Sequence, residues 1–149
     1  MEETGSYLQF FLGIAALALI TAAVRYILKT GFRRADEFEV FNRVFRTERE
    51  PAGRVLKNQY GQLGYMKYKG YLKIIINENG IYFNTESGFA KFGNPLFIPW
   101  KSLRFKSSSS FFFEKYIQLE ADCGDKSPKV EIELSEKVFT PLEIQRLKK

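Results

Sequence analysis

The chain has 149 residues and a formal net charge of +6. It contains no histidine, which excludes Ser-His and Cys-His catalytic pairs, and its single cysteine, Cys123, excludes an intrachain disulfide or a thiolate metal cage. Residues 25–73 hold twelve Lys or Arg against five acids, whereas residues 114–149 hold seven against eight. Composition therefore favours a binding module over a hydrolase, with its positive charge close to the N-terminal apolar segment.

The first predicted element is a transmembrane helix that begins at Tyr7 and ends at Leu28. No charged side chain lies between Thr4 and Val24, and the helix would measure about 33 Å, which matches a hydrocarbon core of about 30 Å. Each large apolar residue in it favours insertion by about 0.3–0.6 kcal/mol. The alternatives are a buried core helix and a cleaved signal peptide, but the leader is acidic and has no good cleavage site.

The charges beside this span predict its orientation. No Lys or Arg precedes the span, and four lie at or just beyond its C-terminal end: Arg25, Lys29, Arg33 and Arg34. By the positive-inside rule, residues 1–6 lie outside and the C-terminal domain faces the cytoplasm, at the cell membrane. Alanines 15, 18 and 22 share one helix face, which could pack against a membrane-protein partner or a second copy of the chain.

Residues 29–53 are predicted to form a basic juxtamembrane segment and a short helix over residues 36–50. Asp36 is the predicted N-cap, Glu39 takes the capping-box position, and Pro51 ends the helix. Its docking face would carry three aromatic residues: Phe38, Phe41 and Phe45. A strand is the alternative, because apolar residues 38, 40 and 44 are separated by even intervals.

Residues 54–149 are predicted to form a β-rich domain that opens with a hairpin. The Asn-Gly pair at residues 79–80 is the preferred sequence for a two-residue type I′ turn, which would join strands over residues 72–77 and 81–86. The register set by that turn pairs Ile76 with Phe83, Ile74 with Thr85, and Lys73 with Glu86.

A second hairpin is predicted to pair residues 116–121 with residues 129–134. Ile, Leu, Val and Ala alternate there with Gln and Glu, so each strand should be buried on one face. Strands over residues 96–100 and 102–106 are expected between the hairpins, with a bend at Pro99. The serines at residues 107–110 are predicted to form a loop.

A C-terminal helix is predicted to begin after Thr140. This residue would be the N-cap, Pro141 would take the first helical position, and Glu143 would complete a capping box. Three apolar residues are available for docking: Leu142, Ile144 and Leu147.

Two runs, GIY at residues 80–82 and PLFIPW at residues 95–100, resemble a motif of small uncharacterised bacterial single-pass membrane proteins. The likeness covers residues 37–134, although Lys101 and Ser102 stand where those proteins often carry an acidic residue or serine after the tryptophan. The strand order and final helix also resemble a bacterial pleckstrin-homology-like (PH-like) barrel, which implies binding rather than catalysis. The predicted class is α+β: a transmembrane helix, a small antiparallel sheet or PH-like barrel, and a C-terminal helix.

Residues 54–73 interleave tyrosines and cations, and no acid lies between Pro51 and Ile76. Cations against anionic headgroups contribute about 1 kcal/mol each close to the surface. The candidate headgroup or partner contacts are Arg25, Lys29, Arg33, Arg34, Arg54, Lys57, Lys67, Lys69 and Lys73. The alternative is a solvated strand face whose lysines discourage edge pairing. Nucleic acid is a remote alternative, because the chain has no RNP-like signature or basic helix.

Two aromatic groups are candidate sites. Phe97 and Trp100 could bind a ligand, but a tryptophan inside an apolar strand is usually part of the core. Three consecutive rings at residues 111–113 cannot all face one side of a strand. At least one of them is therefore expected to be exposed, or to meet the membrane or a partner.

The remaining polar candidates favour no cofactor or metal. Asp122 and Asp125 flank a glycine, but a turn fits them better than a calcium loop, and Cys123 between them is expected to be a plain exposed thiol. The sequence predicts a membrane-anchored, non-enzymatic interaction module that contacts anionic lipid or a membrane-protein partner. The alternative is an enzyme that uses carboxylates, serine or lysine without histidine; its distinguishing feature would be clustered acids in a pocket, such as Glu86 near Glu114.

Overall fold

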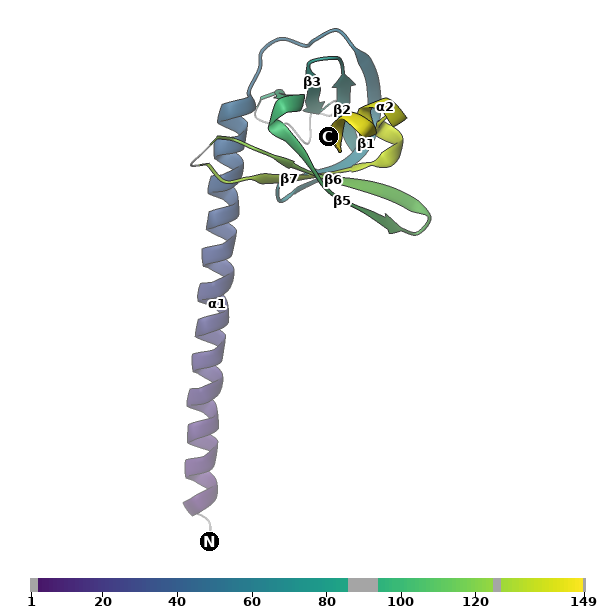
Figure 1. The fold of residues 1–149 in the computed structure, drawn as a ribbon. Coiled ribbons are helices and arrows are strands. Elements are labelled where there is room, and N and C mark those ends of the chain that lie inside the picture. The colour runs from purple at the N-terminus through teal and green to yellow at the C-terminus, as the bar shows by residue number, and fades with distance from the viewer. Residues whose placement is uncertain (1–2, 86–93, 125–126, 149) are drawn as a thin grey trace. The chain divides into compact units, whose positions relative to one another are not determined.

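The computed structural model describes residues 3–85, 94–124 and 127–148, with the side chains of residues 3–10 and 32–34 left out. The chain divides into two compact units, Met1–Ala35 and Asp36–Lys149. The class is α+β, as predicted: an N-terminal apolar helix is followed by an antiparallel sheet and a C-terminal helix (Figure 1).

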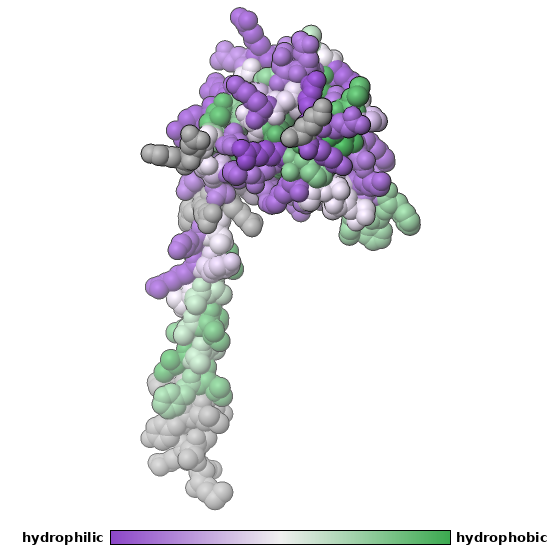
Figure 2. Space-filling model, in the orientation of Figure 1, coloured by the Kyte–Doolittle hydropathy of each residue, from purple (hydrophilic) through white to green (hydrophobic). Residues whose placement is uncertain are grey.

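Helix α1 (Glu3–Phe45) includes the helix predicted over residues 7–28 and the first ten residues of the helix predicted over residues 36–50. Among the described helices it is the one long and apolar enough to cross a membrane, over Phe11–Phe45, and its apolar side chains from Phe11 to Leu28 are exposed (Figure 2). The predicted break at Asp36 was wrong. The residues before it are mostly good helix formers, and a single glycine, Gly31, costs only about 1 kcal/mol.

The C-terminal end of α1 also differs from the prediction, because the helix stops at Phe45 rather than beside Pro51. Arg46 forms a backbone bridge with Leu96, and the N–H of Thr47 donates to the Pro95 carbonyl at 2.9 Å. The chain therefore leaves the helix where its backbone joins the edge of the sheet.

Seven antiparallel strands form one curled sheet, a half-barrel, in the order β4-β3-β2-β1-β7-β6-β5 (Figure 1). The strands are β1 (Arg54–Leu63), β2 (Met66–Ile76), β3 (Gly80–Thr85), β4 (Leu96–Pro99), β5 (Leu103–Phe111), β6 (Glu114–Ala121) and β7 (Val130–Ser135). Strand β1 pairs with β7 only through residues 61–63. A bulge at residues 57–59, with Asn58 at φ 54°, bends β1 before that point.

The β2–β3 hairpin exists, but its predicted register was wrong by two residues. The observed pairs are Ile76 with Ile81, Ile74 with Phe83, Lys73 with Asn84, and Leu72 with Thr85. The N–H of Asn77 donates to the Gly80 carbonyl at 3.2 Å, so Glu78 and Asn79 are the central turn residues. Gly80 is needed for a different reason: a Cβ there would lie 2.3 Å from the Ile98 carbonyl oxygen of β4.

The β6–β7 hairpin confirms its predicted buried faces, and its pairs run from Ala121 with Val130 to Tyr116 with Ser135, so β7 lies one residue later than the predicted strand over residues 129–134. The predicted loop at residues 107–110 was wrong, because these serines belong to β5 and pair with residues 115–118 of β6. Their small side chains suit a strand face without a covering layer, and Ser107 Oγ lies 2.6 Å from Gln118 Oε1. Between β4 and β5 the bend is a 3₁₀ turn, η1 (Trp100–Ser102).

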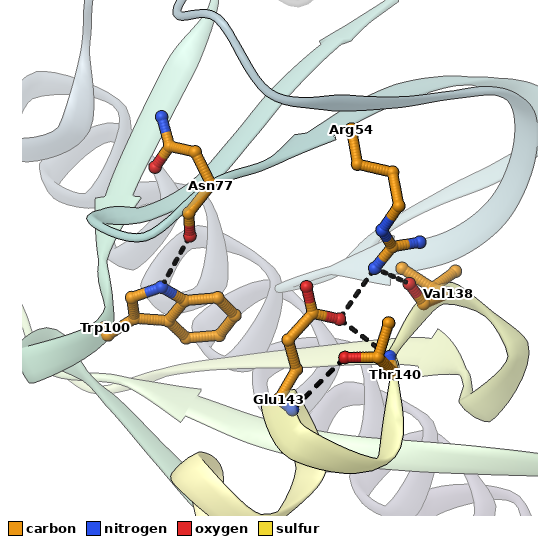
Figure 3. A network of polar contacts seen from close by, with 6 residues as sticks. All are labelled: Arg54, Asn77, Trp100, Val138, Thr140 and Glu143. Atoms are coloured by element: carbon orange, nitrogen blue, oxygen red, sulfur yellow. Dashed lines mark hydrogen bonds and ion pairs between the residues drawn. The ribbon is translucent and has the colours of Figure 1, made fainter.

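The core is formed by the inward faces of the strands together with Phe41 and Phe45 of α1. A 3₁₀ turn, η2 (Glu136–Val138), leads to helix α2 (Pro141–Leu147), whose capping box between Thr140 and Glu143 is confirmed. Arg54 of β1 links this strand to α2 and η2. Its Nη2 donates to Glu143 Oε2 at 2.6 Å and to the Val138 carbonyl at 2.9 Å (Figure 3).

The sequence predicts three docking residues on α2, but only two of them contact the core. Leu147 is buried and Ile144 packs against the core, but Leu142 is 77% exposed. Leu142 is the second residue of a helix of seven, and its direction from the axis places it opposite to the docked side.

Candidate functional site

The predicted basic residues divide into two groups in the folded unit. Arg54 forms an ion pair with Glu143, and Lys73 forms one with Glu50 at 2.7 Å. These two cations therefore stabilise the fold. Lys57 is exposed at the β1 bulge. In the N-terminal unit, Arg25 and Lys29 are exposed, and the side chains of Arg33 and Arg34 lie outside the description.

Lys67 and Lys69 differ from the paired cations. They share the outward face of β2, whose opposite face buries Tyr68 in the core. Across β1 they come opposite Gln62 and Tyr60. Neither lysine forms an ion pair within the part of the chain that the structure describes. Both ammonium groups are therefore available to an anion from solution or from a membrane.

A groove of about 470 Å³, here called the basic groove, lies beside these lysines where β1 leaves β7. One wall carries Lys67 and Lys69 of β2, and the other carries Ser109 and Ser110 of β5. Glu133 of β7 also lines it and accepts a hydrogen bond from Gln118 Nε2 at 2.9 Å. Lysine, serine and tyrosine side chains are donors that suit the oxygens of a phosphate or carboxylate.

Tyr68 also lines the basic groove, although its side chain is buried. Burial, and to a lesser degree the neighbouring Tyr65, raise the pKa of Tyr68 above its ordinary value. The hydroxyl therefore stays protonated at neutral pH, where it can donate a hydrogen bond. Burial is also the main cause that raises the pKa of Tyr82, ahead of the charge of Glu50.

Phe111, Phe112 and Phe113 close the β5–β6 hairpin at the rim of the groove and are here called the aromatic tip. Their side chains are 67%, 78% and 104% exposed. Phe112 and Phe113 have φ values of 45° and 66°, as in a type I′ turn. The prediction that at least one ring is exposed is confirmed, and Figure 2 shows apolar surface at the free end of this hairpin.

Glu114 follows the aromatic tip and is fixed by two donors. Tyr116 Oη donates to it at 2.8 Å, and Lys137 Nζ lies 3.3 Å from its other oxygen. The Tyr116 bond and then Lys137 hold the pKa of Glu114 below its ordinary value, and the same bond raises the pKa of Tyr116. Glu114 is thus an ionised structural acceptor, while its suggested partner Glu86 lies outside the described residues.

Cys123 was predicted to be exposed, and that prediction was wrong. The thiol is buried in the core cluster, and burial, followed by the charge of Asp122, raises its pKa to about 11. The expected turn is present, because Asp122 Oδ1 accepts the N–H of Gly124 at 2.9 Å; Asp125 lies outside the described residues. Among the described residues, no group of three His, Cys, Asp or Glu side chains could hold a metal.

Trp100 packs against the core and is partly buried, in line with its predicted core role. Its Nε1 donates to the Asn77 carbonyl at 2.9 Å, which links η1 to the β2–β3 turn (Figure 3). Phe97 is likewise half-buried on β4.

The basic groove was only half visible in the sequence. The alternation of lysine and tyrosine in β2 indicates one wall, but four consecutive serines predict a loop rather than the strand that forms the other wall. The signal for the strand was the run of small polar residues directly before the apolar tip, which suits a hairpin end that is exposed on both faces.

A scan against protein-family models and searches of curated proteins and of solved structures each found no match to this chain. The resemblances seen in the sequence therefore stay predictions.

Proposed function

We propose that the chain is a membrane-anchored, non-enzymatic binding module whose folded unit binds anionic lipid headgroups in the basic groove. The observation that carries this proposal is the pair Lys67 and Lys69, which lie together on one strand face, without an ion pair among the described residues, and line a groove with serine and tyrosine residues. Two such cations near an anionic surface contribute about 2 kcal/mol.

The anchor in this proposal is the apolar part of α1, with the C-terminal unit on the cytoplasmic side. Its support is the exposed apolar surface between Phe11 and Leu28 and the four cations at its C-terminal end. An isolated helix with such a surface would be costly to hydrate, and a bilayer is the solvent that removes that cost.

The short connection between anchor and folded unit also supports lipid as the ligand. Seven residues, 29–35, separate the proposed span from the second unit. In the structure these residues continue α1, so they cover about 10 Å as a helix. The second unit therefore begins only about 10 Å along the chain from the end of the proposed span, close to the headgroup region.

The architecture is compatible with a PH-like module, which we include in the proposal. Its support is the run of seven antiparallel strands in which β1 lies beside β7, followed by a terminal helix that packs on the core.

Vesicle sedimentation tests the headgroup proposal. The unit Asp36–Lys149, which contains the whole core cluster, is mixed with phosphatidylcholine vesicles with or without phosphatidylserine. We expect binding that needs the anionic lipid, and a loss of about 30-fold in the Lys67→Gln, Lys69→Gln variant, from about 1 kcal/mol per lysine.

The matched control removes two other exposed cations, in an Arg49→Gln, Lys101→Gln variant. It changes the net charge equally but leaves the basic groove intact, so it should bind close to the original protein. Equal losses in the two variants, or equal binding to neutral and anionic vesicles, would show that the groove is not a headgroup site.

A further inference from the structure

The aromatic tip carries phenylalanine at two turn positions where the fold alone would favour Asn or Gly. A type I′ turn needs φ above zero at both central positions, where Asn and Gly are preferred. Here Phe112 and Phe113 occupy those positions at φ 45° and 66°. Side chains with a Cβ are strained in this conformation.

No packing within the described chain compensates for that strain. The Phe113 side chain is fully exposed, and the ring contact that the structure gives Phe112 is with Phe111, at 4.6 Å between centroids. Three adjacent exposed rings present about 500 Å² of apolar surface, since each phenylalanine offers about 200 Å². A patch of that size on a soluble surface is usually a contact site.

The surroundings of the tip indicate what it contacts. Phe111 lines the basic groove together with Lys67 and Lys69, and Lys115 stands exposed on the next strand. Cations beside apolar rings are the arrangement that interfacial membrane segments use, with charge at the phosphates and rings among the acyl chains. A protruding turn also fits a deformable bilayer better than a protein, which would need a matching hollow.

We infer that the aromatic tip is a wedge that enters the acyl-chain region of the bilayer and forms a second attachment point in addition to the anchor. This inference rests on the proposed function, because the groove holds the headgroup while the tip passes between lipids. Strand β7 pairs with β6 only as far as Tyr116. Phe113 therefore extends about 10 Å beyond that last row, which matches the depth of interfacial apolar groups.

Tryptophan fluorescence in nanodiscs tests the wedge with the full chain. Phe112→Trp places the probe in the tip, and Leu142→Trp is the matched control, because the two side chains are 78% and 77% exposed. The nanodiscs contain phosphatidylcholine and phosphatidylserine, with or without bromine on the acyl chains, and the original protein gives the signal of Trp100 alone. We expect brominated lipid to reduce the emission of the tip probe at least twofold and to leave the control unchanged.

Equal quenching of the two probes, or none, would overturn the wedge. An emission shift that appears in native membranes but not in purified lipid would assign the tip to a protein and overturn it as well. Adding Lys67→Gln and Lys69→Gln to the tip probe separates the two proposals. Quenching that survives these changes, and survives in phosphatidylcholine alone, would uphold the wedge while the headgroup proposal fails.

Discussion

Cys123 shows how far one side chain can depart from its sequence context. Gly124 and Pro128 follow it, so the segment looks like an exposed loop. However, the inward positions of β6 are residues 117, 119 and 121, and residue 123 continues that alternation into the core. The backbone thus keeps its two-residue period beyond the last ladder pair, and the thiol is buried.

Burial of this thiol makes stability depend on pH. Its pKa rises from 9.0 to about 11 in the folded protein, so the folded state holds the proton more tightly than the unfolded state does. The resulting stabilisation is complete below pH 9 and is lost as the pH rises towards about 11. We therefore expect the stability advantage of the original protein over a Cys123→Ala variant to shrink over this range in urea denaturation. An advantage that stays constant from pH 8 to pH 11 would contradict the burial of the thiol.

At the scale of elements, strand pairing stabilises the β5–β6 hairpin, whereas the backbone conformation of its turn destabilises it. Residues 103–111 pair with residues 114–121 along their length, with one irregularity between Phe105 and Ser107. The two turn residues have backbone angles that phenylalanine adopts unfavourably, at a cost of about 1 kcal/mol each. The hairpin is thus less stable than its length allows.

Replacing the turn should reveal that cost. In a Phe112→Asn, Phe113→Gly variant, we expect the free energy of unfolding to rise by about 1–2 kcal/mol, because Asn and Gly adopt the left-handed conformation readily. Urea denaturation of the unit Asp36–Lys149 measures the change. The control is Phe112→Leu, Phe113→Leu, which removes the rings but keeps a Cβ at both positions and should give no gain. A similar rise in both variants would place the cost in the exposed rings rather than in the backbone.

At the scale of the whole molecule, α1 belongs to both units. Its residues from Asp36 onward are part of the C-terminal unit. Phe41 is fully buried there, and the centroids of the Phe41 and Phe45 rings are 5.4 Å apart. The end of the helix is therefore a component of the core rather than a linker that leads to it.

Truncating Phe41 should consequently damage the sheet domain. We expect Phe41→Ala to lower the free energy of unfolding by about 3–5 kcal/mol, as large cavities in cores do. Val44→Ala on the same helix is the control, because Val44 is 48% exposed and should cost less than about 1 kcal/mol. Thermal denaturation of the unit Asp36–Lys149 compares them, and equal losses would mean that the helix does not complete the core.

Local patterns predicted the parts of the fold that local forces decide. The buried faces of β6 and β7 follow from the alternation of apolar and polar residues, and the Thr140 cap follows from a short capping sequence. The predicted β2–β3 register was wrong because Gly80 was assigned to the turn. A glycine is required at residue 80 for another reason, since β4 approaches the backbone there too closely for a Cβ. That requirement involves a strand sixteen residues away along the chain, from Gly80 to Leu96.

The same limit applied to the candidate site. Lys67 and Lys69 could be identified as candidates from their alternation with tyrosines, but Arg54 and Lys73 look identical to them in the sequence. Their ion pairs with Glu143 and Glu50 join distant segments. The groove exists because β1 and β7 separate after three paired rows, a tertiary feature that no local pattern contains.

The pairing of β1 with β7 also sets the order of events during synthesis. Strand β1 ends at Leu63 and its partner rows lie at residues 132–134. At about 5–20 residues per second, the ribosome needs roughly 4–14 s to make the intervening chain. During that interval the meander β1–β4 can form locally. Phe41 and Phe45 are not yet fully buried, because the core residues from β5 onward have not been synthesised. The apolar part of α1 emerges first, so on the proposed topology the domain closes its core only after its anchor has entered the lipid.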